Sequence, residues 1–278
     1  MLIASAAAAL LWQVQIQIHP SYVVGNQLVW AAVACFTFYN LHDLYTKVIS
    51  HQSQPTPRQQ FWLRYWPILL LVNAATLVWC YLHYSLQLSS TQWEVTGSTI
   101  LLSLAYSFPV LPFTHMKRWK NNGIWKIVML AFVWAFFCSF FDLTSWNDYH
   151  PTLGLLVFFR VCFLLMITIP FDNRDAAIDQ EYMHRSLRQV WSHEALKNII
   201  LLLGSIGAVA LLVYQIRMQL PILFILAHLL YWCLIVWWSI RAHQQPKAPL
   251  RFLWLDMQLI LQPTFLGFGL LDTYIRST

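Results

Sequence analysis

The amino-acid sequence predicts an all-α integral membrane protein, a bundle of about nine transmembrane helices that forms one domain over residues 1–278. Of the 278 residues, 59% are hydrophobic and only 10% are charged, whereas a soluble domain has about 25% charged residues. A helix needs about 20 apolar residues to cross the hydrocarbon core. Nine apolar runs of roughly this length, separated by polar breaks, follow one another along the chain.

The first predicted span is interpreted as a retained helix, because its opening residues lack the basic start of a secretory signal peptide. Gln13, Gln15 and Gln17 interrupt the first run, and Pro109 and Pro112 close the short fourth run. A bundle of eight helices is therefore the alternative. The approximate bounds are 2–18, 22–45, 66–85, 97–113, 124–142, 153–171, 197–215, 220–240 and 252–272.

Lys and Arg collect in the connections that follow the even-numbered spans and at their flanks. Of the 17 Lys and Arg, only Arg217 and Arg276 fall on the opposite side, while Arg160 lies inside the sixth span. Short cytoplasmic loops are enriched in these residues, so we expect cytoplasmic even-to-odd connections and an external C-terminus. The hypothesis developed below adds a bacterial-type cytoplasmic membrane. The net charge of +6 then marks a face that attracts anionic lipid head groups and phosphate-bearing ligands. No nucleic-acid-binding motif is present.

The cysteines and two ionisable residues lie inside the apolar runs. The five cysteines form no C-x-x-C pair, so we expect packing roles and no redox or metal site. Arg160 and His228 are also predicted to lie inside spans, where an ionisable side chain suggests a function. We interpret His228 as a packed, neutral histidine.

Three aspartates follow the sixth span. Asp172, Asp175 and Asp179 are spaced i, i+3 and i+7, which places them along one narrow stripe of a helix. Like charges on one stripe repel unless a cation joins them. Mg²⁺ prefers oxygen ligands and often binds through carboxylates together with substrate phosphates, so the stripe predicts a Mg²⁺-dependent diphosphate site. The alternative is a solvated helix end whose acids are neutralised by nearby arginines such as Arg174.

A second polar stripe ends the second span, on the same predicted side of the membrane. Asn40, Asp43 and Lys47 repeat the spacing of the aspartates, so the two stripes are expected to face each other across a binding cavity. The alternative is that these residues mark the point where a helix leaves the bilayer.

A third segment runs from the end of the fourth span into a basic connection. Tyr106 precedes Lys117, Arg118 and Lys120. This arrangement suggests the capture of a phosphate group, and an ordinary positively charged cytoplasmic loop is the alternative.

Together these segments resemble the UbiA superfamily of intramembrane prenyltransferases in helix number, polarity and motif order. In that family a D-x-x-D-x-x-x-D sequence follows the sixth helix, and Asp172, Asp175 and Asp179 match it position for position. The segment 106–109, the basic loop after it and the segment 126–134 are similar to the family's fourth and fifth helices. The resemblance extends over nearly the whole chain.

The family's first motif, N-D-x-x-D-x-x-x-D, is altered in this chain. If Tyr39 occupies the position of the family's Asn, Asp43 alone remains of its acids, and Asn40 and Lys47 replace the outer two. If Asn40 occupies that position, no acid remains. We prefer the first register because it preserves the polar stripe. The Lys47 ammonium would then take over part of the charge of one metal ion, leaving a single Mg²⁺ on the second motif.

The resemblance implies a ring of nine helices around a central cavity that opens toward the cytoplasm. It implies transfer of a polyprenyl group from an isoprenoid diphosphate to an aromatic or quinone-precursor acceptor, as in quinone biosynthesis, with Mg²⁺ as cofactor. The site carried over comprises the catalytic acids Asp43, Asp172, Asp175 and Asp179, of which the last three hold the metal, and the diphosphate-binding residues Asn40, Lys47, Tyr106, Lys117, Arg118, Lys120 and Arg174.

Two other classes of function remain. A noncatalytic protein of the same fold would bind lipid or support a membrane complex. A small transporter would need helices broken by Gly or Pro in two halves, and the eight Gly residues are too few and the acids too peripheral for that class.

Overall fold

The computed structural model describes residue 11, residues 25–49, 57–107, 123–181 apart from 142, 144 and 149, residues 187–246, and the four residues 254, 255, 257 and 258. Every regular element in these ranges is a helix, so the predicted all-α class is confirmed. The long helices are α2 (Gly25–Ile49), α3 (Pro57–Tyr84), α4 (Ser90–Ser107), α6 (Gly123–Phe140), α7 (Thr152–Glu181), α9 (His193–Arg217) and α10 (Ile222–Gln244). Three single turns accompany them: η1 (Ser85–Gln87), η2 (Trp146–Asp148) and α8 (Leu187–Val190).

Four described helical segments are long and apolar enough to cross a membrane, which confirms the membrane character of the chain. These segments are Arg64–Gln87, Thr152–Arg174, His193–Arg217 and Ile222–Gln244, and two shorter apolar helices cover Gln27–Thr37 and Ile127–Phe140. The predicted spans 2–18 and 252–272 lie almost entirely outside the described residues.

Two helices extend well beyond the spans that the sequence predicts. The helix around span 66–85 already begins at Pro57, and the helix around span 153–171 ends only at Glu181. An apolar run predicts only the part of a helix that lies in lipid. The helix itself continues into water for as long as its backbone hydrogen bonds are satisfied. Proline is favoured in the first turn of a helix, which accounts for the early start at Pro57.

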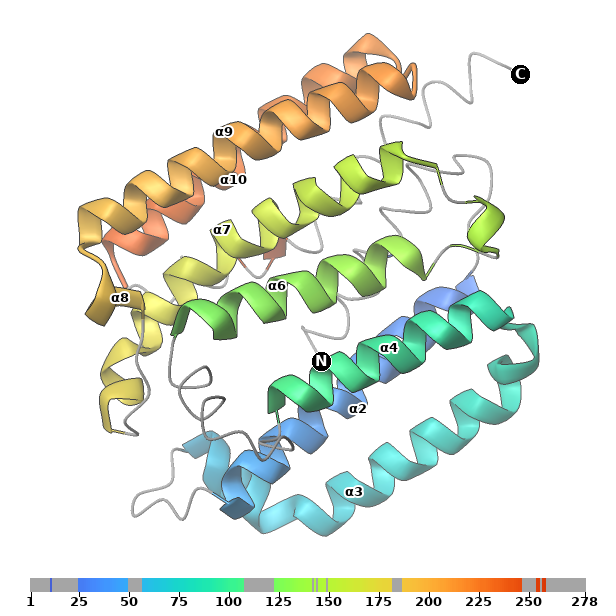
Figure 1. The fold of residues 1–278 in the computed structure, drawn as a ribbon. Helices are drawn as coiled ribbons and strands as arrows, with labels where there is room; N and C mark the ends of the chain where they lie inside the picture. Colours follow the sequence, from blue (N-terminus) through green and yellow to red (C-terminus); the bar gives the residue numbers. More distant parts are fainter. Residues whose placement is uncertain are drawn as a thin grey trace.

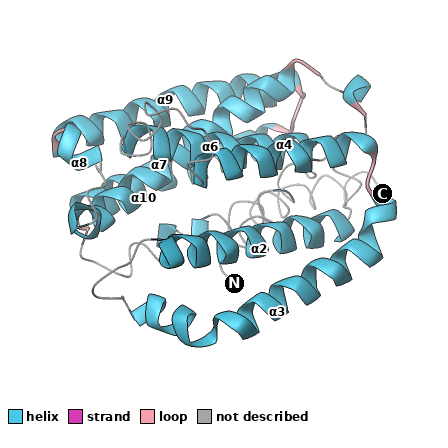
Figure 2. Ribbon diagram, turned by 60° about the horizontal axis from the view of Figure 1, so that its bottom comes forward, coloured by secondary structure: helices cyan, strands magenta, loops and turns pink. Residues whose placement is uncertain are grey.

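α7 is the central helix of the described bundle. It packs against α6, α9 and α10, while α4 packs on α6 and α2 packs on α3. Figure 2 shows α2 and α3 together along one side of the molecule. Phe159 and Phe163 of α7 are buried against the indole of Trp232 on α10, at 4.8 and 6.0 Å between ring centroids. The large exposed side chains of α3, α9 and α10 are mostly apolar, as expected for helices that face lipid.

Two glycines bring α9 and α10 into close contact. The indole Nε1 of Trp232 donates a 2.7 Å hydrogen bond to the carbonyl of Gly204. A Cβ atom at Gly207 would lie 2.6 Å from Cζ2 of the same indole, and one at Gly204 would lie 2.7 Å from a methyl carbon of Val236. Small residues allow membrane helices to approach in this way, and here Gly207 makes room for the largest buried side chain of α10, that of Trp232.

Consecutive long helices run in opposite directions, so that their ends fall into two groups. The C-terminal ends of α2, α4, α7 and α10 and the N-terminal ends of α3, α6 and α9 lie toward the left of Figure 1. We call this the aspartate end, because α7 brings Asp172 to it. The opposite end, which carries η1, η2 and the turn between α9 and α10, is called the far end.

Candidate functional site

The aspartate motif lies on the last turns of α7. Pro170 lies within this helix, and Figure 1 shows the yellow end of α7 bent away from its earlier course. Such a bend is expected because proline cannot donate a hydrogen bond to the preceding turn. Helical backbone continues through Asp172, Asp175 and Asp179, so the three positions fall within an arc of about 60°. The apolar part of the helix ends at Arg174.

Asp172 is buried and fixed by the chain that follows α7. Its Oδ2 atom accepts a 2.7 Å hydrogen bond from the backbone N–H of Leu187, the first residue of α8. A carboxylate oxygen has more than one lone pair, so this contact leaves Asp172 able to accept from other donors or to bind a cation. The side chains of Asp175 and Asp179 lie outside the described residues.

Asn173 connects α7 to α8 and α10. Its Nδ2 atom donates to the carbonyl of His243 at 3.0 Å and lies 3.3 Å from the Nδ1 atom of the same residue. Its Oδ1 atom is 3.5 Å from Nη1 of Arg188, which donates to it. Asn173 and His243 are both buried, so the contacts between them are shielded from water, whereas the contact with the exposed Arg188 is part-buried.

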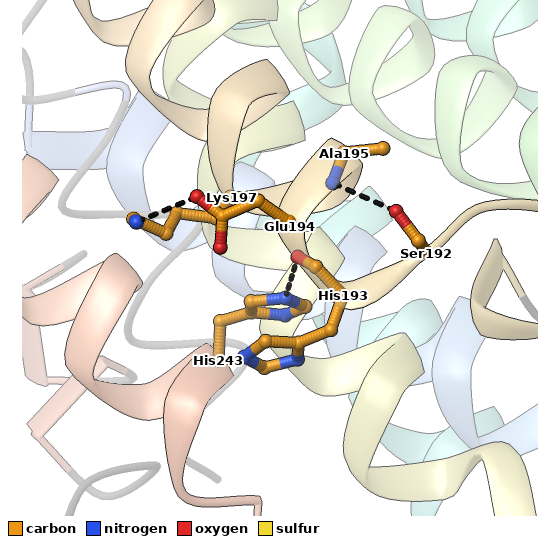
Figure 3. A network of polar contacts seen from close by, with 6 residues as sticks. All are labelled: Ser192, His193, Glu194, Ala195, Lys197 and His243. Carbon is orange, nitrogen blue, oxygen red and sulfur yellow. Dashed lines mark hydrogen bonds and ion pairs between the residues drawn. The ribbon is translucent and has the colours of Figure 1, made fainter.

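His243 in turn reaches the start of α9. Its Nε2 atom lies 3.1 Å from the carbonyl oxygen of His193, and the two imidazoles stack with centroids 4.1 Å apart and planes inclined by 12°. Figure 3 shows the two rings face to face. The side chain of Ser192 caps α9 by accepting from the N–H of Ala195 at 3.1 Å. The stack therefore lies against a well-defined helix start.

The remaining predicted site residues divide into those that the structure describes and those that it does not. The guanidinium of Arg174 is exposed and lies over the ring of Phe171, 5.0 Å from its centroid. The Nδ2 atom of Asn40 donates a 3.1 Å hydrogen bond to Oδ1 of Asn73 on α3. The backbone of Asp43, Lys47 and Tyr106 is helical, but their side chains lie outside the described residues, as do Lys117, Arg118 and Lys120 in full.

The helices that carry the motifs all end on the same side. The C-terminal turns of α2, α4 and α7 all lie at the aspartate end (Figure 1). α2 carries the first stripe, α4 carries Tyr106, and α7 carries the aspartates. The described ends of these three helices thus lie at one end of the bundle, and the shared side of the membrane stays a prediction.

The donor chemistry of the α7 motif fits Mg²⁺. Three carboxylates on one helix face offer the hard oxygen ligands that this ion prefers, and Asp172 is already held in place. Among the described side chains, no three His, Cys, Asp or Glu residues lie close enough to hold a metal ion, and Asp175 and Asp179 do not belong to that set. Asp172, Asp175 and Asp179 are the residues that would hold Mg²⁺.

A second buried polar group lies toward the far end. His228 is buried, as the packing interpretation predicts, and its Nδ1 atom is 2.7 Å from Nε2 of Gln215 on α9. The rings of Phe159 and Phe224 meet the imidazole edge-on, each with its centroid 5.9 Å away. Arg160 is also buried. This group joins α7, α9 and α10 about 20 Å from His243, because fifteen residues of α10 separate the two histidines.

Sequence reasoning missed the roles of Asn73, His193 and His243. Asn73 is the lone amide in the apolar part of α3, and a buried amide inside a membrane needs a partner, so its position was a usable signal. The pairing of His193 with His243 depends on how α9 and α10 meet and leaves no trace in local spacing. No protein family, curated protein or solved structure matches this chain.

Proposed function

We propose that this chain is an intramembrane prenyltransferase of the UbiA type, with its helices arranged around a central cavity. It transfers a polyprenyl group from an isoprenoid diphosphate to an aromatic or quinone-precursor acceptor. The observation that carries the proposal is the unbroken helix through Asp172, Asp175 and Asp179. This helix holds three carboxylate positions on one face at the end of the apolar part of α7, with Asp172 inside that part and Asp175 and Asp179 beyond it.

The negative charges of the aspartates and of the diphosphate explain why the proposed site needs a metal ion. A diphosphate bears several negative charges, and three aspartates repel it unless a divalent cation lies between them. Asp172, Asp175 and Asp179 would hold Mg²⁺ at this point, and the ion would supply the positive charge that a diphosphate leaving group requires. The 2.7 Å hydrogen bond from the N–H of Leu187 orients Asp172 in advance as one of the three metal ligands. Preorganised sites lower a reaction barrier in this way. The apolar helices keep water from the prenyl chain.

Two further features support a site at this end. The first polar stripe on α2 and the end of α4 lie on the same side as the aspartates (Figure 1). Arg174 and Arg188 are both exposed there, and arginine is well suited to phosphate oxygens. The proposal includes a bacterial-type cytoplasmic membrane in which the aspartate end faces the cytoplasm, because the basic connections collect there.

A noncatalytic, lipid-binding or scaffolding role is the second candidate, and specific contacts favour it. Asp172 and Asn40, both expected in the site, make hydrogen bonds within the bundle, to Leu187 and to Asn73. In this role the polar residues stabilise the bundle, and any bound isoprenoid diphosphate is held without Mg²⁺.

Calorimetry with geranylgeranyl diphosphate and purified protein in detergent separates the two candidates. The wild type is compared with Asp175→Asn, with and without Mg²⁺. Glu94→Gln serves as a matched control at the far end, where Glu94 accepts a 2.8 Å hydrogen bond from Trp146 that a glutamine can also accept. We expect Mg²⁺-dependent binding in the wild type and in Glu94→Gln, and none in Asp175→Asn.

Two outcomes, one in this experiment and one in a second step, count against the transferase. Binding that is independent of Mg²⁺ and equal in Asp175→Asn supports the noncatalytic role. Mg²⁺-dependent binding leads to the second step, incubation with labelled geranylgeranyl diphosphate and a panel of aromatic acid and quinone-precursor acceptors. Failure to label any acceptor, with intact binding, removes the catalytic part of the proposal and keeps the diphosphate site.

A further inference from the structure

Four helical elements are joined at the point where the aspartate-bearing end of α7 begins. Asp172 and Asn173 of α7 bond to Leu187 and Arg188 of α8, and Asn173 also bonds to His243 of α10. His243 then contacts His193 of α9. The turns that carry Asp175 and Asp179 extend beyond this junction and beyond the apolar part of α7. Their direction is therefore set at the junction.

The donors and acceptors in the junction fix one arrangement. A carbonyl oxygen can only accept, so His243 must carry its proton on Nε2 to bond to the carbonyl of His193. Its Nδ1 atom is then an acceptor and faces the Nδ2 donor of Asn173. This leaves Oδ1 of Asn173 to accept from Arg188. Each polar atom has a complementary partner, and reversing the amide of Asn173 would place like atoms together.

We infer that Asn173 and His243 are positioning residues for the metal-binding aspartates, acting through the end of α7 and not by contact with the substrate. This inference rests on the proposed diphosphate site. Groups that hold metal ligands from outside commonly change metal affinity by about tenfold or more when removed. His243 is suited to this task because it is buried, stacked on His193 and bonded on both ring nitrogens.

The experiment measures the Mg²⁺ concentration at which geranylgeranyl diphosphate binding is half-maximal. Asn173→Ala removes the side-chain bonds to α8 and α10, and we expect it to raise this midpoint about tenfold. His243→Gln keeps a donor for the carbonyl of His193 but removes the Nδ1 acceptor. Its effect should be smaller, because Asn173 still donates to the backbone carbonyl of residue 243.

His228→Gln is the matched control. It replaces a buried histidine on the same helix, which also contacts α9 through a polar bond, but at the far end. We expect it to lower thermal stability as His243→Gln does and to leave the Mg²⁺ midpoint unchanged. Hydrogen exchange in the protein without Mg²⁺ adds a second readout: exchange of the backbone amides in residues 174–181 should increase in Asn173→Ala and His243→Gln but not in His228→Gln.

The outcomes separate this inference from the proposed function. If the wild type shows no Mg²⁺-dependent binding, the proposed function and the inference both fail. If the wild type binds but the midpoints of Asn173→Ala and His243→Gln move no further than that of His228→Gln, the site stands and the positioning role is overturned. Unchanged exchange of residues 174–181 in both junction variants overturns it as well.

Discussion

The backbone N–H of Leu187 donates a 2.7 Å hydrogen bond to Oδ2 of Asp172, fifteen residues earlier in the chain. The chain thus leaves α7 at Glu181 and returns to the level of Asp172 before α9 begins. The Asp172 carboxylate therefore stabilises this return of the chain, in addition to any role in binding a ligand. Variants of Asp172 must therefore distinguish the loss of its charge from the loss of its hydrogen-bond acceptor.

Asp172→Ala is expected to destabilise the protein by about 1–3 kcal/mol, because it leaves a buried N–H of Leu187 without an acceptor. Asp172→Asn retains an acceptor oxygen and should cost clearly less. Thermal unfolding in detergent, followed by circular dichroism, measures both. Equal losses in the two variants would show that the charge of Asp172, and not its bond to Leu187, is what stabilises the fold.

Gly207→Ala is expected to lower stability by about 1–3 kcal/mol through overpacking. The added methyl would lie 2.6 Å from Cζ2 of Trp232 and 3.2 Å from Cβ of Cys162. The indole cannot easily move away, because its Nε1 atom is bonded to Gly204. Gly97→Ala in α4 is the control, since a Cβ there meets nothing within 4 Å. A melting temperature for Gly207→Ala equal to that of Gly97→Ala would mean that α10 shifts freely against α9.

The sequence predicts the helices well and the contacts between them poorly. Apolar runs identified α7, α9 and α10, and the aspartate spacing correctly anticipated one face of a continuous helix, because both features are local. The junction of Asn173, His243 and His193 was not predicted, since its residues lie up to 70 positions apart and meet only when α7, α9 and α10 pack. The nine-helix count and the UbiA-type site remain predictions.

Asn40 and Asn73 are expected to stabilise the pair of helices α2 and α3 through their 3.1 Å bond. A double-mutant cycle with Asn40→Ala and Asn73→Ala should give a coupling energy of about 0.6 kcal/mol, the usual scale for such bonds between membrane helices. Thermal unfolding of the four proteins measures it. A coupling near zero, together with weaker diphosphate binding in Asn40→Ala alone, would instead assign Asn40 to the ligand, as the family resemblance implies.

Cysteine labelling tests the orientation in the membrane. Asn147 and Gln189 are exposed, and α7 is the long helix between them, so the structure places them at opposite ends of one span. In a background without the five native cysteines, Asn147→Cys should react with a membrane-impermeant maleimide in intact cells, whereas Gln189→Cys should react only after lysis. The physical reason is that the basic connections collect at the end that carries Gln189. The reverse pattern would place the aspartates outside the cell, and labelling of both positions from one side would mean that α7 does not cross the membrane.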